Sequence, residues 1–147
     1  MGRGIDNMIT IYDYEDLEKF YDKRSNSYYF PDDIQIGCFV ADLFDENDEH
    51  SDVFSDGNIY VECSLLGREL RARGVYGEHI NFDVIKCDEI KAKELRGGII
   101  IADYINCQEI YYGDICIATK KLKYDKIEKM IGNTSCHLCL ADLKENK

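Results

Sequence analysis

The sequence of 147 residues contains no tryptophan, one proline and three histidines. The single proline, Pro31, argues against a disordered linker, and no apolar run approaches the roughly eighteen residues that a membrane-spanning helix needs. The N-terminal residues also lack the charged-then-apolar pattern of a secretory signal. We therefore expect one compact, cytoplasmic domain with no membrane partner.

Recognisable catalytic motifs are also missing. The sequence has no nucleophile elbow, no glycine-rich phosphate loop and no HExxH pair. These absences predict a protein that is not an enzyme and that holds no cofactor.

The seven cysteines are odd in number, which favours free thiols over a disulfide framework. Cys136 and Cys139 have CxxC spacing, but a structural zinc site needs four ligands and a second such pair is absent. We interpret Cys87, Cys107, Cys136 and Cys139 as small buried hydrophobic residues and expect no metal site.

The second half of the chain has a five-residue period. Large aliphatic residues recur every five positions, and a small residue follows most of them after two positions. The large residues are Leu65, Leu70, Val75, Ile80, Ile85, Ile90, Leu95, Ile100, Ile105, Ile110 and Ile115, and the small ones are Gly67, Ala72, Gly77, Cys87, Ala92, Gly97, Ala102 and Cys107. Neither an α-helix nor a plain strand has this period. The first and third residues of an extended unit point the same way, so both are predicted to line the interior of a coil.

A second period of twenty residues accompanies the first. The segments LLGREL, IKCDEI and INCQEI share one pattern and begin twenty residues apart, so four five-residue faces would complete a turn. Glu69, Glu89 and Glu109 would then form an outward column, and Cys87 would stack on Cys107 inside, about 4.8 Å apart. The predicted fold is mainly β: a short four-sided parallel β-solenoid of about 20 residues per turn, with a small acidic α/β cap at its N-terminal end.

The run IKCDEIKAKELRGGIIIADYINCQEIYYGDICIA resembles the pentapeptide-repeat proteins, whose four-sided coil is also built from five-residue faces. It is most similar to an uncharacterised group of Firmicutes and phage proteins with I-x-A-x-x units, and the resemblance extends over about residues 59–143. In pentapeptide repeats the small residue typically precedes the large one by two positions, whereas here it follows. The resemblance implies the architecture and a phage or mobile-element origin, and it transfers no catalytic residues.

Three segments are predicted: an acidic N-terminal cap packed on the solenoid (1–58), the solenoid (59–122) and a C-terminal closing segment (123–147). A cap is expected because an open coil end exposes unpaired strand edges. The predicted strands are Met8–Tyr12, Tyr28–Phe30, Ile34–Phe44 and Cys136–Leu143, and the predicted helices run from Asp13 or Tyr14 to about Lys23 and over Tyr124–Met130.

The acidic excess lies entirely in the first 58 residues, which contain fifteen acids and four bases for a net charge of −11. Residues 59–147 contain fourteen of each. Within the cap, one run carries seven carboxylates and no lysine or arginine. It comprises Asp42, Asp45, Glu46, Asp48, Glu49, Asp52 and Asp56. Such a run is either a solubilising loop or a surface for a basic partner protein.

Two aromatic features suggest binding surfaces. Tyr28 and Tyr29 precede Phe30 near the acidic run, and tyrosines of this kind anchor protein interfaces. A second, basic and aromatic set lies on the predicted coil faces and could bind a small ligand such as a nucleotide. It comprises Arg71, Tyr76, Lys91, Arg96 and Tyr111. Glutamates alternate with these bases, so a mixed surface is expected rather than direct nucleic-acid binding.

The function that these features favour is a non-enzymatic protein-binding module. The resemblance to phage-borne repeats and the acidic run together predict an inhibitor of a bacterial protein, one that handles nucleic acid or serves in defence, acting in the cytoplasm of the bacterial host cell. Two alternatives remain open: a structural solenoid that assembles into oligomers through its coil ends, and a small-ligand or nucleotide-binding protein that uses the basic and aromatic faces.

Overall fold

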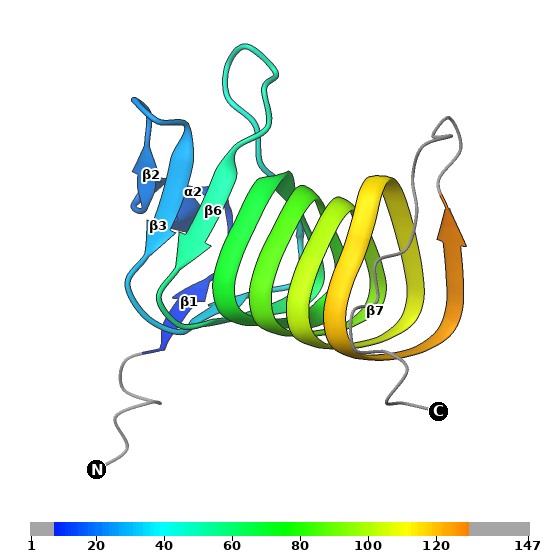
Figure 1. The fold of residues 1–147 in the computed structure, drawn as a ribbon. Helices are drawn as coiled ribbons and strands as arrows, with labels where there is room; N and C mark the ends of the chain where they lie inside the picture. Colours follow the sequence, from blue (N-terminus) through cyan, green and yellow to red (C-terminus); the bar gives the residue numbers. More distant parts are fainter. Residues whose placement is uncertain (1–7, 130–147) are drawn as a thin grey trace.

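The computed structural model describes residues 8–129, except for the side chains of residues 112–118, 128 and 129. The chain is mainly β and forms an open, curled sheet with a short helix at one end (Figure 1). Its elements are β1 (Ile9–Ile11), α2 (Tyr14–Glu18), β2 (Tyr21–Asp22), β3 (Ser27–Phe30), β4 (Ile34–Ile36), β5 (Val40–Asp42), β6 (Asp52–Ser55) and β7 (Asn58–Lys129). Within residues 8–129, no helix is long and apolar enough to cross a membrane.

The strands follow the order β1-β4-β7-β6-β3-β2, and β5 also pairs with β7. The pairings that join β1, β4, β5, β6, β3 and β7 are parallel, whereas β2 and β3 pair antiparallel. The sheet is therefore mixed, which corrects the wholly parallel arrangement predicted from the sequence.

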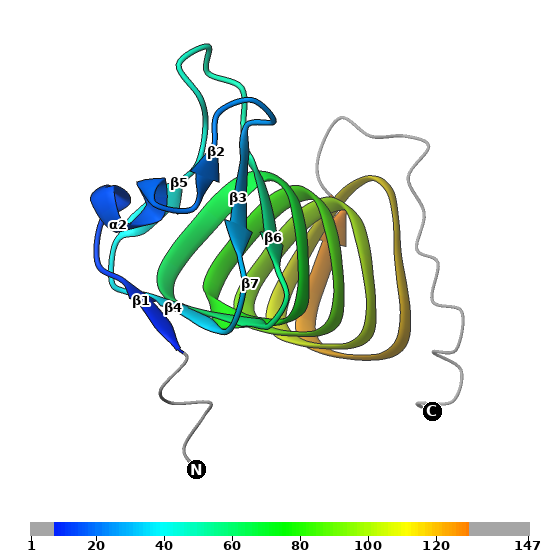
Figure 2. The ribbon, with the colours of Figure 1, turned by 90° about the vertical axis from the view of Figure 1, so that its left-hand side faces the viewer.

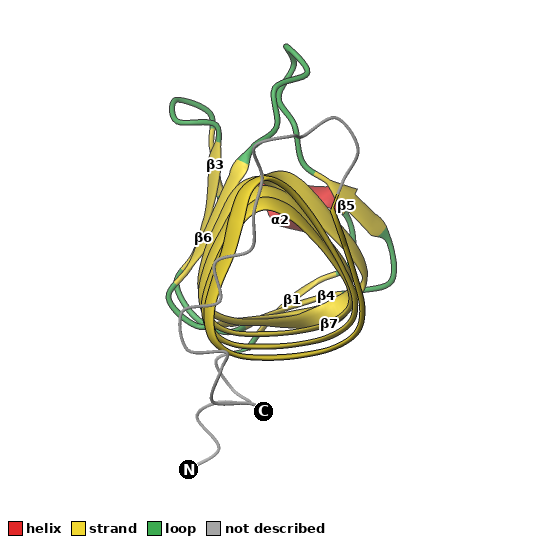
Figure 3. Cartoon of the chain, turned by 45° about the vertical axis from the view of Figure 1, so that its right-hand side comes forward, coloured by secondary structure: helices red, strands yellow, loops and turns green. Residues whose placement is uncertain are grey.

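β7 winds through successive turns that overlie one another (Figures 1 and 3). At its start it pairs with three earlier strands in succession. β4 lies against Ile59–Val61, β5 against Ser64–Leu66 and β6 against Leu70 and Arg71. Three different strands thus border a stretch of β7 that is thirteen residues long, from Ile59 to Arg71.

Contacts between successive turns of β7 recur at intervals of fifteen or sixteen residues. The rings of Tyr60 and Tyr76 stack 5.2 Å apart, and Thr119 Oγ1 donates a hydrogen bond to the carbonyl oxygen of Asp103 at 3.2 Å. The backbone of Ala72, fifteen residues earlier, lies close enough to the thiol of Cys87 to influence its pKa. The predicted turn of twenty residues, and with it the four-sided section, is therefore wrong for these contacts.

The predicted interior positions are confirmed along β7. The large aliphatic residues from Leu65 to Ile110 are almost fully buried, and so are the residues two positions after most of them, including Cys87 and Cys107. The stacking within the interior differs from the prediction, because the neighbour of Cys107 on the preceding turn is Ala92, fifteen residues earlier, rather than Cys87. Outside, the predicted glutamate column would need residues twenty positions apart to stack, whereas Glu89 accepts a hydrogen bond from Tyr76 Oη, thirteen residues earlier, at 2.7 Å.

Phe82 is the one large residue among the small interior positions between 67 and 107, and its ring explains one glycine, Gly67. A Cβ on Gly67, fifteen residues earlier, would lie 2.5 Å from Phe82 Cε2. A Cβ on Gly97, fifteen residues later, would lie 3.1 Å from the Phe82 carbonyl oxygen. The ring of Phe82 therefore occupies space that the missing side chain of Gly67 leaves free.

The N-terminal region has longer turns than β7. Ile9 pairs with Ile34 and Ile34 with Ile59, so the interval is twenty-five residues. The extra residues form α2, the β2–β3 hairpin and a loop that projects beyond the coil (Figure 2). β1 and β3 confirm two predicted strands, while the strand predicted for Ile34–Phe44 is two strands, β4 and β5.

The predicted helix begins as expected but ends early. Asp13 is its N-cap, and its Oδ1 accepts a hydrogen bond from Asp16 N at 3.0 Å. The helix ends at Glu18 rather than Lys23, because Tyr21 pairs across the hairpin with Tyr28 and their rings pack 4.7 Å apart. This pairing overrides the helical apolar spacing.

The C-terminal predictions are tested only in part. Tyr124–Lys129 belongs to β7, so the helix predicted over Tyr124–Met130 is wrong for these residues. The predicted strand Cys136–Leu143 lies outside the described residues, as does the CxxC pair.

Candidate functional site

The acidic run forms a projecting loop between β5 and β6, which we call the acidic loop (residues 43–51; Figure 1). Its two sides meet at an antiparallel bridge between Phe44 and His50. Asp45 organises the tip, because its Oδ1 accepts hydrogen bonds from Asn47 N at 2.8 Å and Glu49 N at 3.0 Å. The carboxylate of Asp45 therefore stabilises the turn itself.

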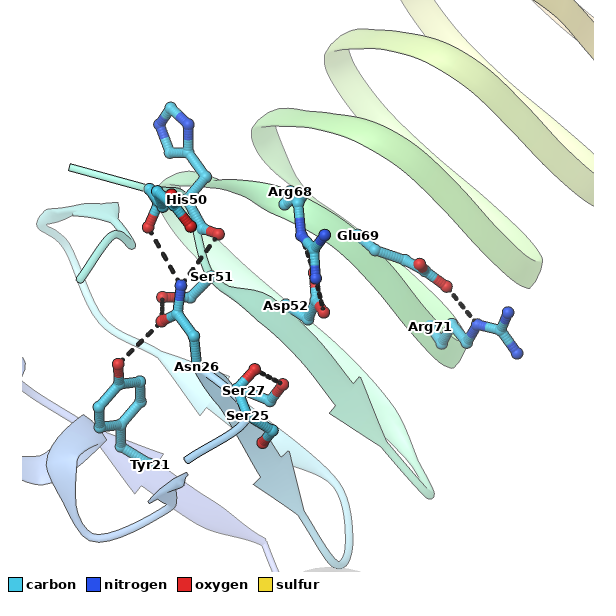
Figure 4. Close-up of polar contacts among 11 residues, drawn as sticks. Tyr21, Ser25, Asn26, Ser27, His50, Ser51, Asp52, Arg68, Glu69 and Arg71 are labelled. Carbon is cyan, nitrogen blue, oxygen red and sulfur yellow. Dashed lines mark hydrogen bonds and ion pairs between the residues drawn. The ribbon is translucent and has the colours of Figure 1, made fainter. Parts of the chain in front are cut away.

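Asn26 holds the base of the acidic loop (Figure 4). Its Nδ2 donates hydrogen bonds to the carbonyl oxygens of Glu49 at 3.2 Å and His50 at 3.3 Å. Its Oδ1 accepts from Tyr21 Oη at 2.8 Å and Ser51 Oγ at 2.5 Å. Asn26 has a φ of 51°, a left-handed conformation that asparagine tolerates better than most residues. One side chain thus ties the β2–β3 turn to the loop.

Three carboxylates of the loop are free to meet a partner. Glu46, Asp48 and Glu49 are exposed, and the ion pair of Glu46 with Lys23, at 4.0 Å, joins two side chains that are at least three-quarters exposed. Such a pair contributes little to stability. Asp42 is half-buried, and its Oδ1 lies 3.4 Å from Nε2 of His50, an ion pair when His50 is protonated.

Asp52 differs from the rest of the predicted acidic set, because it is buried, with an exposure of 7%. Arg68 makes a two-pronged contact with it: Nε lies 2.8 Å from Oδ1 and Nη2 lies 2.5 Å from Oδ2. This hydrogen bonding and the charge of Asp52 raise the pKa of Arg68. Asp52 therefore joins two neighbouring turns and does not present a free carboxylate.

The two tyrosines predicted to anchor an interface differ in exposure. Tyr28 is buried against Tyr21, and burial raises its pKa to about 12. Tyr29 is 49% exposed and stacks on Phe54 with ring centroids 5.3 Å apart. Only Tyr29 can contact a partner, since neighbouring side chains on a strand point to opposite faces.

Tyr29 and Phe54 line a surface cavity of about 490 Å³ that Asp56 also borders. Asp56 is exposed, and its backbone N donates to the carbonyl oxygen of Phe30 at 3.0 Å. The structure therefore brings one predicted carboxylate and one predicted tyrosine together beside a hydrophobic ring.

The predicted ligand-binding set is divided between separate places. Tyr76 and Lys91 line one groove together. Arg96 lies over the ring of Tyr111, 4.3 Å from its centroid, and its Nε contacts Glu94 Oε2 at 2.5 Å. Arg71 is paired with Glu69 at 2.5 Å. These five residues do not form one site.

The described cysteines, Cys38, Cys63, Cys87 and Cys107, are free thiols. Cys87 and Cys107 are buried, and burial raises the pKa of each to about 12, which makes them poor nucleophiles. Residues 8–129 contain no group of three or more side chains arranged to hold a metal ion, as far as their side chains are described.

No protein-family model, curated protein or solved structure matches this chain. The interpretation of the site therefore depends on its own geometry.

Asn26, which shapes the site, was not identified from the sequence. Asp45 was predicted as one of seven acids that could meet a partner, but not as the residue that holds the turn. The available signal for Asn26 was its place in the Ser25–Asn26–Ser27 turn between two tyrosine-containing strands, where asparagine is favoured because it accepts a positive φ.

Proposed function

We propose that this chain is a non-enzymatic protein-binding module that presents the acidic loop to a basic surface on a bacterial protein. The observation that carries the proposal is the arrangement of the loop: three exposed carboxylates, Glu46, Asp48 and Glu49, project on a backbone fixed by Asp45 and Asn26. A loop held in one conformation has less entropy to lose on binding than a flexible one.

The exposed Tyr29 and the half-buried Phe54 on which it stacks would supply the apolar part of the interface. Aromatic residues provide much of the energy of protein interfaces, whereas exposed charges act mainly through steering and specificity. The carboxylates of the loop would speed encounter with the partner, and the aromatic pair with its neighbouring cavity would slow dissociation.

We further infer that the curled sheet is a β-solenoid with three faces of five residues. The contact interval of fifteen or sixteen residues and the three strands that border the start of β7 support three faces. The resemblance to phage-borne repeat proteins supports a phage or mobile-element origin, and hence an inhibitor of a defence or nucleic-acid-handling protein in the host cytoplasm.

The proposal is tested by capturing partners from nuclease-treated bacterial lysate with the full chain and then measuring association rates of the identified partner. The loop variant carries Glu46→Gln, Asp48→Asn and Glu49→Gln, which spare Asp45. The matched control neutralises three carboxylates away from the loop: Glu62→Gln, Asp88→Asn and Asp103→Asn, all exposed on β7.

The loop variant should associate at least about tenfold more slowly at low salt, and the difference should shrink as salt rises. Tyr29→Ala should mainly raise the dissociation rate. If the loop variant and the control variant bind alike, the acidic loop is a solubility feature and the proposal is wrong.

A further inference from the structure

A groove on β7 combines positive charge with an aromatic stack in a protein whose net charge is −11. Its volume is about 580 Å³, which lies within the range of roughly 300–1,000 Å³ typical of small-molecule sites. The lining residues come from successive turns of the coil. They are Tyr60, Tyr76, Gly77, Glu78, Lys91, Ala92, Lys93, Asn106 and Gln108.

The groove contains two exposed lysines, Lys91 and Lys93. Among the described residues, Arg71 and Arg96 are each paired with a glutamate, whereas Lys91 and Lys93 have no carboxylate partner. Both lysines are exposed and lie two positions apart on one strand, so their side chains leave the same face. Two unpaired cations on one face form a site for an anion. Glu78 is the one carboxylate among the lining residues, and it restricts where that anion can lie.

The aromatic part of the groove is held in place. The rings of Tyr60 and Tyr76 are stacked, with an interplanar angle of 18°. Tyr76 Oη donates a hydrogen bond to Glu89 Oε1 at 2.7 Å, which fixes the ring, and burial and Glu89 together raise the pKa of Tyr76. Because Tyr60 covers one face of the Tyr76 ring from the preceding turn, the other face is directed toward the turn that carries Lys91.

We propose that this groove binds a nucleoside phosphate. The base extends the Tyr60–Tyr76 stack on the free face of Tyr76, the phosphate contacts Lys91 and Lys93, and the amides of Asn106 and Gln108 are within the same groove to bond the base edge or the sugar. A simple carboxylate ligand would leave the aromatic stack unused, and a neutral aromatic ligand would leave the two lysines unpaired. A nucleoside phosphate uses both. This site is separate from the acidic loop, and either proposal can fail alone.

The test is calorimetric titration of the full chain with four probes: adenosine 5′-monophosphate, adenosine, inorganic phosphate and a single-stranded octa-adenylate. Adenosine and inorganic phosphate should each bind at least about tenfold more weakly than the monophosphate, because each engages half of the site. Equal affinity per site for the monophosphate and the octa-adenylate assigns the site to free nucleotides. A much tighter, strongly salt-dependent octa-adenylate complex assigns it to single strands.

Variants separate the two halves of the site. Lys91→Ala with Lys93→Ala should weaken monophosphate binding by about tenfold or more, whereas Arg73→Ala with Lys86→Ala, which remove the same charge outside the groove, should not. Tyr76→Leu should remove the preference for the monophosphate over inorganic phosphate, and Tyr76→Phe should keep it. The proposal is overturned if inorganic phosphate binds as well as the monophosphate, if no probe binds at millimolar concentration, or if the control pair weakens binding equally.

Discussion

The N-terminal turns and the turns of β7 stack their strands in the same parallel manner but differ in length. Equivalent residues lie twenty-five positions apart from Ile9 to Ile34 to Ile59, and fifteen or sixteen apart along β7. The additional residues leave the stack as α2, the β2–β3 hairpin and the acidic loop. Parallel strand pairing therefore tolerates long insertions between the paired segments, as long as those segments pair in the same register.

The two regions also place their polar groups differently. Along β7 the buried side chains that the structure describes are apolar except for that of Thr119. Around the acidic loop, buried polar residues such as Ser51 and Asp52 are each satisfied by a specific partner, Asn26 and Arg68. We therefore expect substitutions in β7 to lower the free energy of unfolding through changes in buried volume and charge. Substitutions near the loop should lower it through the loss of single hydrogen bonds.

The largest effect is expected for Ile90→Asp, because Ile90 is fully buried and an unpaired carboxylate would replace it. The variant should lose more than about 4 kcal/mol of unfolding free energy or fail to fold. The same substitution at the exposed neighbour Lys91 should cost less than about 1 kcal/mol. Chemical denaturation measures both, and comparable losses at the two positions would contradict the five-residue register.

The next largest effect is expected for Gly67, whose contact with Phe82 depends on a turn of fifteen residues. Gly67→Ala should cost about 2 kcal/mol, because the added Cβ would lie 2.5 Å from Phe82 Cε2 and 2.7 Å from the carbonyl oxygen of Ser51. In a Phe82→Ala background, the cost of Gly67→Ala should fall by about 1 kcal/mol, since the ring is gone while Ser51 remains. A double-mutant cycle with no coupling between positions 67 and 82 would rule out their contact across one turn.

This pair also shows what the sequence could and could not predict. The five-residue spacing identified the interior residues, because burial repeats with every unit whatever the length of the turn. The number of units per turn is a separate property, and we took it from the similarity of LLGREL, IKCDEI and INCQEI. The better guide was a volume match: the large Phe82 follows Gly67 by fifteen residues, and its ring occupies the space beside that glycine.

The candidate site was predictable in position but not in detail. The acidic run is a projecting loop, as its charge suggested, but Asp52 and Tyr28 are buried. Tyr28 lies on a strand where alternation turns it inward and Tyr29 outward, whereas Asp52 is covered by Arg68 from the next turn. Composition alone does not contain the register, so it could not separate Tyr28 from Tyr29.

A moderate effect is expected where the loop is anchored. Asn26→Ala removes the donors to Glu49 and His50 and leaves Tyr21 and Ser51 without their acceptor, so it should cost about 2 kcal/mol. Asn26→Asp, which keeps the acceptor and loses the donors, should cost less. Hydrogen exchange should show faster opening of the loop than of β7, and uniform acceleration across the chain would argue against a local anchor.

A smaller effect concerns alkaline pH and contrasts the interior with the surface. The pKa of Cys87 and of Cys107 is raised by burial to about 12, from an ordinary value of 9.0. Between these two pH values the unfolded chain loses the two thiol protons while the folded chain keeps them. The free energy of unfolding is therefore unaffected by these thiols below about pH 9 and falls as the pH rises toward 12.

Replacing both thiols should remove part of this alkaline loss. Between pH 8 and 10 each thiol should account for about 1 kcal/mol. The double variant Cys87→Ala with Cys107→Ala fits the slots that Ala92 and Ala102 occupy elsewhere, and its unfolding free energy should fall less over that interval. Identical pH profiles for the two proteins would show that other groups cause the loss.

The smallest effect on folding is expected for the exposed carboxylates of the acidic loop. Glu46→Gln, Asp48→Asn and Glu49→Gln together should change the unfolding free energy by less than about 0.5 kcal/mol, because exposed charges of one sign contribute little and repel one another. Asp45→Ala, a single change in the same loop, should cost about 1 kcal/mol, since Asn47 N and Glu49 N would lose their acceptor. Asp45→Asn, which retains a carbonyl oxygen at that place, should recover most of the loss. Thermal unfolding of the three variants therefore separates charge from hydrogen bonding. If the triple variant is destabilised as much as Asp45→Ala, the exposed carboxylates help to hold the structure of the loop. A slower association of the triple variant with a partner could then result from a changed loop rather than from lost charge.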